Sequence, residues 1–378
     1  MSFCKRLQTI FSNVCKNYRI FALCPCLTVY FKIEDVALTQ ESRLTLTGLA
    51  KLAGVSTSTA SRALRDNPLI KKETRERIQA LAKEHSFSIN HAASQLRTQK
   101  TNVVAVILNL TDHTEQSIND PFLLKMVSAL NLALNKAGYE MLLSNSMMAD
   151  SDWASYFISS RRADGLIIVG QGKSEDNVND VVTAKAPLVV WGDPKLNKNY
   201  PIVGSDNQYG GYLATKQLIE SGCKKVLFLG DTEHTEMAQR YLGYQQALKE
   251  AELHFDPSLT IDIDITSKAA YEKVNQEILN RGLFFDGIFA VSDMVAFGAL
   301  KALKERYVSI PGDVSVVGFD DINMAELFHP ALTTVRQDTD LAAQLMVEQL
   351  ICQFEQKPAQ SKVLEVELIK RRSTPESY

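Results

Sequence analysis

Apolar residues recur at helical spacing in one early part of the chain and in continuous runs over most of the rest. Between residues 46 and 85 they return every three or four positions in three short stretches, which predicts three short helices. Gly54 follows the first stretch and tolerates a positive φ, and Ser56 can cap the helix after it. The third stretch begins near Lys71. Three short helices with a glycine in the first turn are typical of a helix-turn-helix unit.

From residue 102 onward, short apolar runs alternate with amphipathic stretches. Runs such as NVVAVILNL (102–110) and GLIIVG (165–170) fit strands that are buried on both faces of a sheet. Their alternation with helices predicts an α/β body of two doubly wound lobes with parallel sheets. Several predicted strands end in polar pairs: Gly230–Asp231, Ser292–Asp293 and Asp320–Asp321. Because ligands bind beyond the carboxyl ends of such strands, these pairs predict a binding site.

Charge is unevenly distributed along the 378 residues. Residues 44–100 hold 10 Lys and Arg against 4 Asp and Glu, whereas the chain after residue 100 holds 25 against 37. A small basic segment ahead of a large acidic body is typical of a module that binds a polyanion. The plain alternative is a chance cluster of lysines on a solvated helix.

Residues 1–43 fit neither pattern. They begin basic and turn apolar like an export signal, but Pro25 interrupts the apolar run and no small-residue cleavage site follows it. The segment is too short and too mixed to span a bilayer, so no membrane partner is predicted. Three interpretations stay open: a start assigned too far upstream, a disordered extension, and a targeting segment.

The cysteines do not predict a metal site. Four of the six cysteines lie within the first 26 residues, and their spacing is not that of a zinc site. The sequence therefore predicts reduced thiols and neither a metal nor a cofactor.

Motifs spread over residues 44 to about 375 together resemble the LacI/GalR family of bacterial transcription regulators. They include AGVSTSTASRAL (53–64), RYLGYQQAL (240–248), SDMVAFGAL (292–300) and VGFDDINMAELFHPALTTVRQD (317–338), in family order and at family spacing. The resemblance implies a periplasmic-binding-protein-like body behind the helix-turn-helix. The implied domains are a leader (1–43), an all-α helix-turn-helix domain (44–88), a hinge helix or linker (89–100) and an effector-binding and dimerisation domain (101–378).

Inside the last domain, the resemblance implies two lobes that share the chain. The N-lobe takes about 101–203 and 335–360, and the C-lobe takes about 204–334 and 361–378. Two positions depart from the family pattern: Gly48 stands where Asp is usual, and Lys71 stands where Ser or Thr caps a helix. These departures concern local stability rather than the interpretation as a whole.

The resemblance also implies a homodimer, or a dimer of dimers, on a near-palindromic operator in double-stranded DNA. The helix that begins near Ser56 would lie in the major groove, with Thr57 and Ser58 at the specificity positions and Arg62 facing a guanine. Phosphate contacts are implied for Ser56, Thr59, Ser61, Thr74 and Asn90. Leu96 would wedge into the central base step and kink it. The alternatives are ordinary cap and helix residues and a simple linker leucine.

A small-molecule effector, a mono- or oligosaccharide, is implied between the two lobes. Sugars require planar polar groups for their hydroxyls and aromatic rings for their apolar faces. The matching positions are Arg240, Asp293, Asp320, Gln337, Trp191, Phe122 and Ser292. The alternative roles are helix capping for Asp293 and Asp320 and simple packing for Trp191.

The prediction is a cytoplasmic, nucleoid-associated repressor of carbohydrate-utilisation genes that a sugar controls allosterically. The alternatives are a periplasmic-type sugar-binding protein without a DNA role and a regulator that responds to another metabolite. An enzyme is disfavoured: GQGKS (170–174) mimics the end of a phosphate loop, but Ile167 stands where that motif needs glycine.

Overall fold

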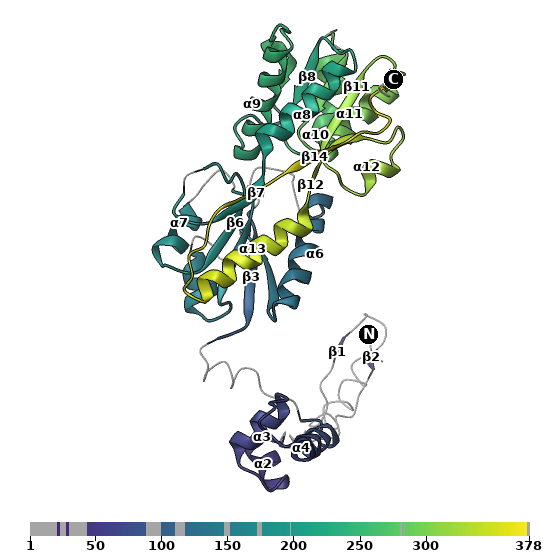
Figure 1. Cartoon of the computed structure of the whole chain (residues 1–378). Helices are drawn as coiled ribbons and strands as arrows, with labels where there is room; N and C mark the ends of the chain where they lie inside the picture. Colours follow the sequence, from purple (N-terminus) through teal and green to yellow (C-terminus); the bar gives the residue numbers. More distant parts are fainter. Residues whose placement is uncertain are drawn as a thin grey trace, which may run out of the picture. The chain divides into compact units, whose positions relative to one another are not determined.

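The computed structural model describes two compact units of the chain, residues 1–98 and residues 99–378 (Figure 1). The described residues are 44–87, 100–109, 118–146, 152–171, 176–196, 198–279, 282 and 284–375, with the two short strands β1 (Phe21–Ala22) and β2 (Thr28–Val29), which pair antiparallel. The rest of the leader lies outside them, as does the predicted hinge helix with Asn90 and Leu96. Among the described helices, none is both long enough and apolar enough to span a bilayer.

The first unit contains the three helices that the periodicity predicts. They are α2 (Leu46–Leu52), α3 (Thr57–Leu64) and α4 (Lys72–Glu84). Thr45 and Ser56 cap the first two helices, because each side-chain oxygen accepts a hydrogen bond from a backbone amide three residues on, at 3.1 Å. Lys71 caps α4 without a side-chain hydrogen bond. The helices enclose a small core of Leu49, Ala53, Ala63, Ile78 and Ala82.

The first lobe of the second unit has one parallel sheet in the order β13-β7-β6-β5-β3-β4. The strands are β3 (Val103–Leu108), β4 (Glu140–Asn145), β5 (Gly165–Val169), β6 (Leu188–Trp191), β7 (Ile202–Ser205) and β13 (Lys362–Leu364). Alternate residues of β3 face opposite sides, so Val104 and Val106 pack under helices and Ala105 and Ile107 pack on the other face. The first face is covered by α6 (Pro121–Lys136) and α13 (Thr339–Phe354), and the second by the π-helical η2 (Ala154–Ser159) and by α7 (Asp176–Thr183).

The second lobe repeats this plan in the strand order β14-β12-β11-β10-β8-β9. Its strands are β8 (Val226–Leu229), β9 (Thr260–Ile261), β10 (Gly287–Ala290), β11 (Ser315–Asp320), β12 (Thr333–Gln337) and the antiparallel β14 (Val366–Ile369). Its helices are α8 (Asn207–Glu220), α9 (Thr235–Glu250), η3 (Pro257–Leu259), α10 (Ser267–Lys273), η4 (Val274–Leu279), α11 (Asp293–Glu305) and α12 (Met324–Leu327). α8 and α9 touch backbone to backbone at Gly211 and Gly243, where a Cβ atom would collide with the partner helix.

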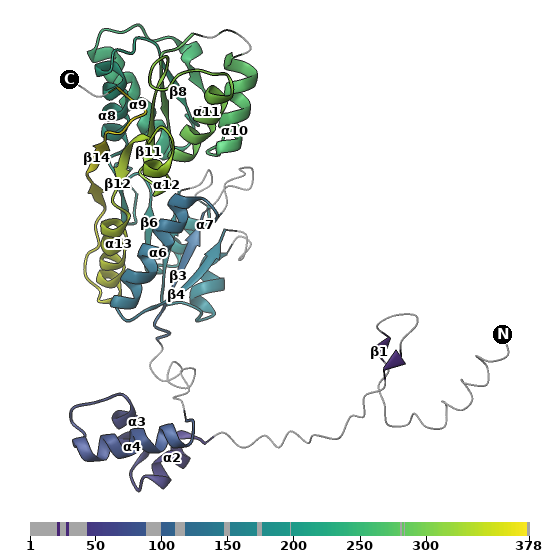
Figure 2. The ribbon, with the colours of Figure 1, turned by 90° about the vertical axis from the view of Figure 1, so that its right-hand side faces the viewer.

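The chain crosses between the lobes after β7, after β12 and after β13 (Figure 2). These positions differ from the predicted boundaries at 335 and 361. β12 stays in the second sheet as far as Gln337, and β13 pairs with β7 of the first sheet, with Val363 opposite Gly204. A strand belongs to the lobe whose sheet it pairs with. The local sequence does not specify which strand it pairs with.

Candidate functional site

The exposed face of α3 carries the side chains that the sequence predicts for DNA. Thr57, Ser58 and Arg62 are exposed, while Ala60 and Ala63 on the opposite face are buried. The Ser56 hydroxyl oxygen lies 2.8 Å from the hydroxyl oxygens of both Ser58 and Thr59. Small side chains that hold one another in this way leave a low surface that can approach base edges closely.

Two side chains of α4 hold α3 in position. The Arg77 guanidinium donates to the carbonyl oxygen of Ala53 at 2.9 Å, and the Gln79 amide donates to that of Ala63 at 3.2 Å. The first bond holds the turn before α3, and the second holds the last turn of α3. Nothing in the sequence marks Arg77 or Gln79, because both lie on a helix on which most other charged residues are exposed. The remaining predicted phosphate-contact residues of this unit, Ser61 and Thr74, are half-buried.

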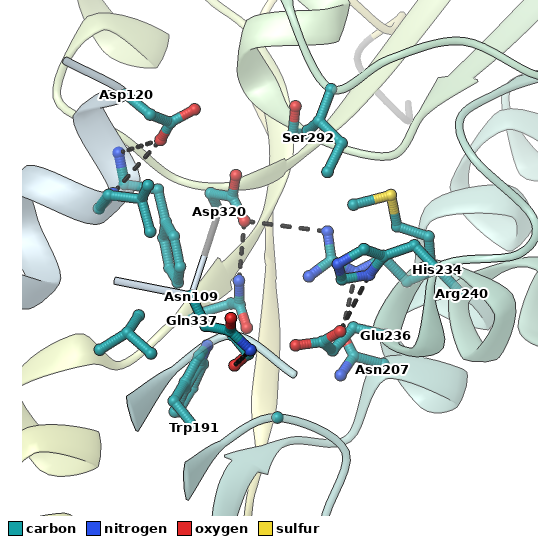
Figure 3. A pocket seen from close by; sticks show the side chains of 17 residues that line it. Asn109, Asp120, Trp191, Asn207, His234, Glu236, Arg240, Ser292, Asp320 and Gln337 are labelled. Atoms are coloured by element: carbon teal, nitrogen blue, oxygen red, sulfur yellow. Dashed lines mark hydrogen bonds and ion pairs between the residues drawn. The ribbon is translucent and has the colours of Figure 1, made fainter. Parts of the chain in front are cut away.

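In the second unit, a pocket lies beyond the carboxyl ends of strands from both sheets (Figure 3). Six of the seven residues predicted for a ligand line it: Phe122, Trp191, Arg240, Ser292, Asp320 and Gln337. They come from strand ends and from the helices and caps that follow the strands, which is where doubly wound sheets bind ligands. The structure thus brings these six predicted residues together among the 17 that line the pocket.

Arg240 is the central polar residue of the pocket and is only 6% exposed. Its Nε donates to Asn207 Oδ1 at 2.8 Å, and its Nη1 donates to the carbonyl oxygen of Val291. The guanidinium carbon lies 3.6 Å from the ring centroid of Phe319, a cation–π geometry. These contacts hold the fork in one orientation, with Nη1 4.0 Å from Asp320 Oδ1 (Figure 3).

Asp320 ends β11 and takes a positive φ of 113°, which turns it into the pocket. The Gln337 amide, at the end of the neighbouring strand β12, donates to its Oδ1 at 2.7 Å. Burial raises the pKa of Asp320 above its usual range, and nearby Arg240 opposes that shift. The carboxyl, the amide and the guanidinium form a connected polar wall.

The first lobe contributes an apolar wall to the pocket. The rings of Phe122 and Trp191 lie with centroids 6.3 Å apart and planes at 43°. Asp120 precedes them as the cap of α6, where its Oδ1 accepts from the amides of Phe122 and Leu123 at 2.9 and 3.3 Å. The cap fixes the entry of α6 and with it the Phe122 ring.

Asp293 does not lie where the sequence predicts it. It is fully buried outside the pocket lining, and its two carboxylate oxygens accept from the Thr334 hydroxyl at 2.5 Å and the Ile322 amide at 2.9 Å. It thus ties the start of α11 to β12 and to the segment after β11. Burial raises its pKa to about 7. Its neighbour Ser292 reaches the pocket and also caps α11, accepting from the Val295 amide at 3.2 Å.

The sequence missed an acid–base pair at the start of α9. His234 Nδ1 lies 3.0 Å from Glu236 Oε2, and both residues line the pocket. Burial alone would lower the pKa of His234 and raise that of Glu236, but their mutual attraction outweighs it, so the pKa of His234 is raised and that of Glu236 is lowered. Asn109 and Asn207 also line the pocket. Single polar residues after a strand occur in many proteins, so the sequence gives no signal for them.

Metal binding is not supported in the part of the chain that the structure describes. No group of three or more His, Cys, Asp or Glu side chains there is placed to hold a metal ion.

Known proteins share both units. Residues 45–90 match the model of bacterial regulatory proteins of the lacI family, and residues 215–374 match the periplasmic binding protein-like domain. The chain is 30% identical over 335 residues to the HTH-type transcriptional regulator MalR of Clostridium butyricum, covering 86% of this chain and 97% of that protein. This chain belongs to the lacI family of bacterial regulatory proteins.

Other members extend the match. The HTH-type transcriptional repressor PurR of Histophilus somni is 26% identical and covers 87% of this chain and 98% of its own. A solved complex of the transcriptional regulator CelR with cellobiose is 27% identical, with a TM-score of 0.65 over 87% of this chain and 99% of that chain. The lac repressor dimer bound to operator superposes with a TM-score of 0.76 over 87% of this chain and 98% of its own, at 23% identity, and shows the shared fold.

Several predictions are confirmed by these matches. The protein is a transcriptional regulator and not an enzyme, and the alternative of a sugar-binding protein without a DNA role is overturned by the helix-turn-helix domain. Regulators of this family bind DNA and small-molecule effectors. A bacterial transcriptional regulator that binds DNA acts in the cytoplasm.

Proposed function

We propose that this regulator represses carbohydrate-utilisation genes and that a neutral mono- or oligosaccharide in the pocket controls its affinity for DNA. The observation that carries the proposal is the pairing of two unlike walls. The aromatic wall of Phe122 and Trp191 suits the C–H face of a sugar ring, and the polar wall of Arg240, Asp320 and Gln337 suits its hydroxyls.

The charge balance favours a neutral ligand. The Arg240 guanidinium is already opposed by Asp320, and His234 is already opposed by Glu236. A phosphorylated or otherwise anionic ligand would meet no unopposed cation at these positions. Hydroxyl groups, by contrast, donate and accept and can join both pairs without separating them.

The ligands of similar proteins point the same way. Besides the cellobiose complex of CelR, a regulator of this family from Enterococcus faecium with bound ribose is 27% identical to this chain, with a TM-score of 0.62 over 71% of this chain and 98% of its own. The relatives named PurR support a second candidate function, that of a regulator that responds to a metabolite other than a sugar.

On the DNA side, we infer that Thr57, Ser58 and Arg62 read base edges in the major groove. Ser56, Thr59, Ser61 and Thr74 would hold phosphates, as would Asn90, while Leu96 would wedge into the central base step. The exposure of Arg62 and the low hydroxyl surface beside it support this assignment for α3. Asn90 and Leu96 lie outside the described residues, so their roles rest on the family resemblance. The bound protein would be associated with the nucleoid.

Exposed apolar side chains on a helix of each lobe, which we call the apolar stripe, are suited to the interface of a homodimer. Leu124 and Leu132 of α6 are 48% and 56% exposed, and Met324 and Leu327 of α12 are 46% and 83% exposed. α12 lies above α6 in both views of the ribbon, so the helices that carry these exposed side chains come one from each lobe. Two copies that bury this stripe would present two DNA-binding units to a near-palindromic operator.

Control by the sugar requires that it bind one arrangement of the lobes better than another. The pocket draws residues from both lobes, so a ligand that contacts both walls favours the arrangement in which they are close. The resulting change in DNA affinity cannot exceed that difference in binding free energy.

A thermal-shift screen of the purified chain tests the proposal. We expect at least one neutral mono- or disaccharide to raise the unfolding temperature of the native chain and to leave that of an Asp320→Asn variant nearly unchanged. An Asp264→Asn variant, changed at an exposed acid outside the pocket, serves as the matched control. A panel in which nucleobases shift the native chain and no sugar does would favour the second candidate instead.

A further inference from the structure

A second hollow is lined mainly by α8 and α9, and it shares no lining residue with the pocket around Arg240. Its volume is about 400 Å³, within the range of small-molecule sites. Its floor is formed by Tyr209 and Tyr212, one turn apart on α8, whose rings are inclined by only 18° with centroids 6.1 Å apart. Tyr209 is 50% exposed. The two rings are stacked and Tyr212 is half-buried, so the half-exposed ring of Tyr209 supplies an apolar platform that stacks on the Tyr212 ring.

The rim of this hollow joins the two lobes where the chain crosses between them. Lys195 comes from the loop after β6 of the first lobe, and its Nζ lies 2.8 Å from Oδ1 of Asp206, the cap of α8. The Asp206 amide donates to the carbonyl oxygen of Leu364, at the last residue of β13, at 2.9 Å. The rim is therefore built on two of the crossings, and we name it the hinge hollow.

Planar polar groups complete the rim on α9. Gln246 donates to Glu250 Oε1 at 2.9 Å and accepts from the Gln208 amide at 3.5 Å. The Lys195–Asp206 pair is electrically neutral, and the Glu250 carboxylate is held by Gln246 and Tyr212. The hinge hollow thus combines aromatic faces with amides and carboxylates and carries no excess of positive charge.

We propose that the hinge hollow is a second ligand site, which takes a neutral pyranose sugar. The C–H face of such a ring packs on the exposed ring of Tyr209, and its hydroxyls bond to the amides and carboxylates of the rim. Anions are disfavoured because the Lys195 ammonium is already paired with Asp206. The site is distinct from the pocket around Arg240 and does not depend on what that pocket binds.

The two sites share the first turn of α8. Asn207 points into the pocket and accepts from Arg240, while its neighbours Asp206 and Gln208 line the hinge hollow. The close contact of α8 and α9 at Gly211 and Gly243 joins the two helices into one tightly packed body. A ligand that contacts Lys195 and this body touches both lobes at their hinge and so favours one arrangement of the lobes over another.

Ligand-observed NMR with methyl α-D-glucopyranoside as the probe tests the site in the full chain. An Arg240→Ala background weakens the first pocket, and we expect millimolar binding of the probe to persist there. Adding Tyr209→Ala should weaken that binding about three- to tenfold, the loss expected for one ring contact. Adding Tyr209→Phe, which keeps the platform, should leave it unchanged.

Tyr307→Ala is the matched control, because Tyr307 is 95% exposed and lines neither site. Unfolding curves of each variant check that the second unit stays folded. The proposal is overturned if the Arg240→Ala chain shows no probe binding, or if Tyr209→Ala and Tyr307→Ala give equal affinities.

Discussion

The surface of α3 and the pocket of the second unit use polar side chains in opposite ways. Thr57, Ser58 and Arg62 are exposed, and water can satisfy them when no DNA is present. Arg240 and Asp320 are 6% and 7% exposed, so protein groups must satisfy them before any ligand arrives. The DNA surface can therefore change with little effect on folding, whereas changes in the pocket affect binding and stability together.

The difference also explains the chemistry of each site. A surface that must approach a phosphate backbone gains from small side chains and a few long cations. A buried pocket that must recognise several hydroxyls gains from groups whose orientation is fixed in advance. Arg240 shows the second case, because Asn207, Val291 and the Phe319 ring hold it in place.

Arg240→Lys should have the largest effect on the pocket. An ammonium group cannot replace the planar fork that reaches Asn207 and Val291, so we expect effector affinity to fall about 100-fold, or about 2–3 kcal/mol. Affinity for operator without effector should stay the same. Titration with the sugar that gives the largest thermal shift measures the change, with the exposed Arg161→Lys as control. Equal affinities in both variants would contradict the role of Arg240.

Arg62→Ala should act on DNA alone. Loss of a bidentate contact to guanine should weaken specific binding by about 1–3 kcal/mol and leave the effector affinity unchanged. Fluorescence anisotropy with operator DNA at one fixed salt concentration measures it. Lys83→Ala removes the same charge from the exposed end of α4 and should have a smaller effect. If both substitutions weaken binding equally, Arg62 contributes charge and not sequence readout.

Asp293→Asn should change how the stability of the second unit depends on pH. Burial raises the folded-state pKa of Asp293 to about 7 from 3.8, so the folded protein holds a proton that the unfolded chain releases. That contribution is complete below about pH 4 and is lost as pH rises towards 7, by up to about 1.4 kcal/mol per pH unit.

Asparagine can accept from the Ile322 amide and donate to the Thr334 hydroxyl without titrating, so the pH dependence should be flatter in Asp293→Asn. Urea unfolding between pH 5 and 8 measures this, with the exposed Asp264→Asn as control. A pH dependence that is identical in Asp293→Asn and the native chain would show that Asp293 stays ionised.

Lys71→Ser should give the smallest effect and a gain. Serine at the cap of α4 can accept a backbone hydrogen bond that Lys71 does not make, which should stabilise the first unit by about 1 kcal/mol. Thermal unfolding followed by circular dichroism measures the gain. Lys72→Ser, one residue into the helix, removes the same charge without creating a cap, and a similar gain there would refute the explanation.

The sequence predicted the helices of the first unit and the exposed face of α3 because helix periodicity and capping are local. It also predicted that polar residues at strand ends would gather in a pocket. It did not separate Asp320 from Asp293, since both stand at or just beyond the carboxyl end of a buried strand. Asp320 turns into the pocket through its positive φ, whereas Asp293 is bonded to Thr334 and Ile322.

The amino-acid order thus determined two doubly wound lobes, a basic helix-turn-helix unit and the strand ends at which ligands bind, because each follows from the pattern of neighbouring residues. The tertiary structure decided that β13 joins the first sheet, that His234 and Glu236 pair in the pocket, and that Tyr209 and Lys195 meet at the hinge hollow. Some of these contacts join residues that are distant in the chain, and others depend on how the surrounding elements orient a side chain. Only the packing of the folded chain fixes such partners.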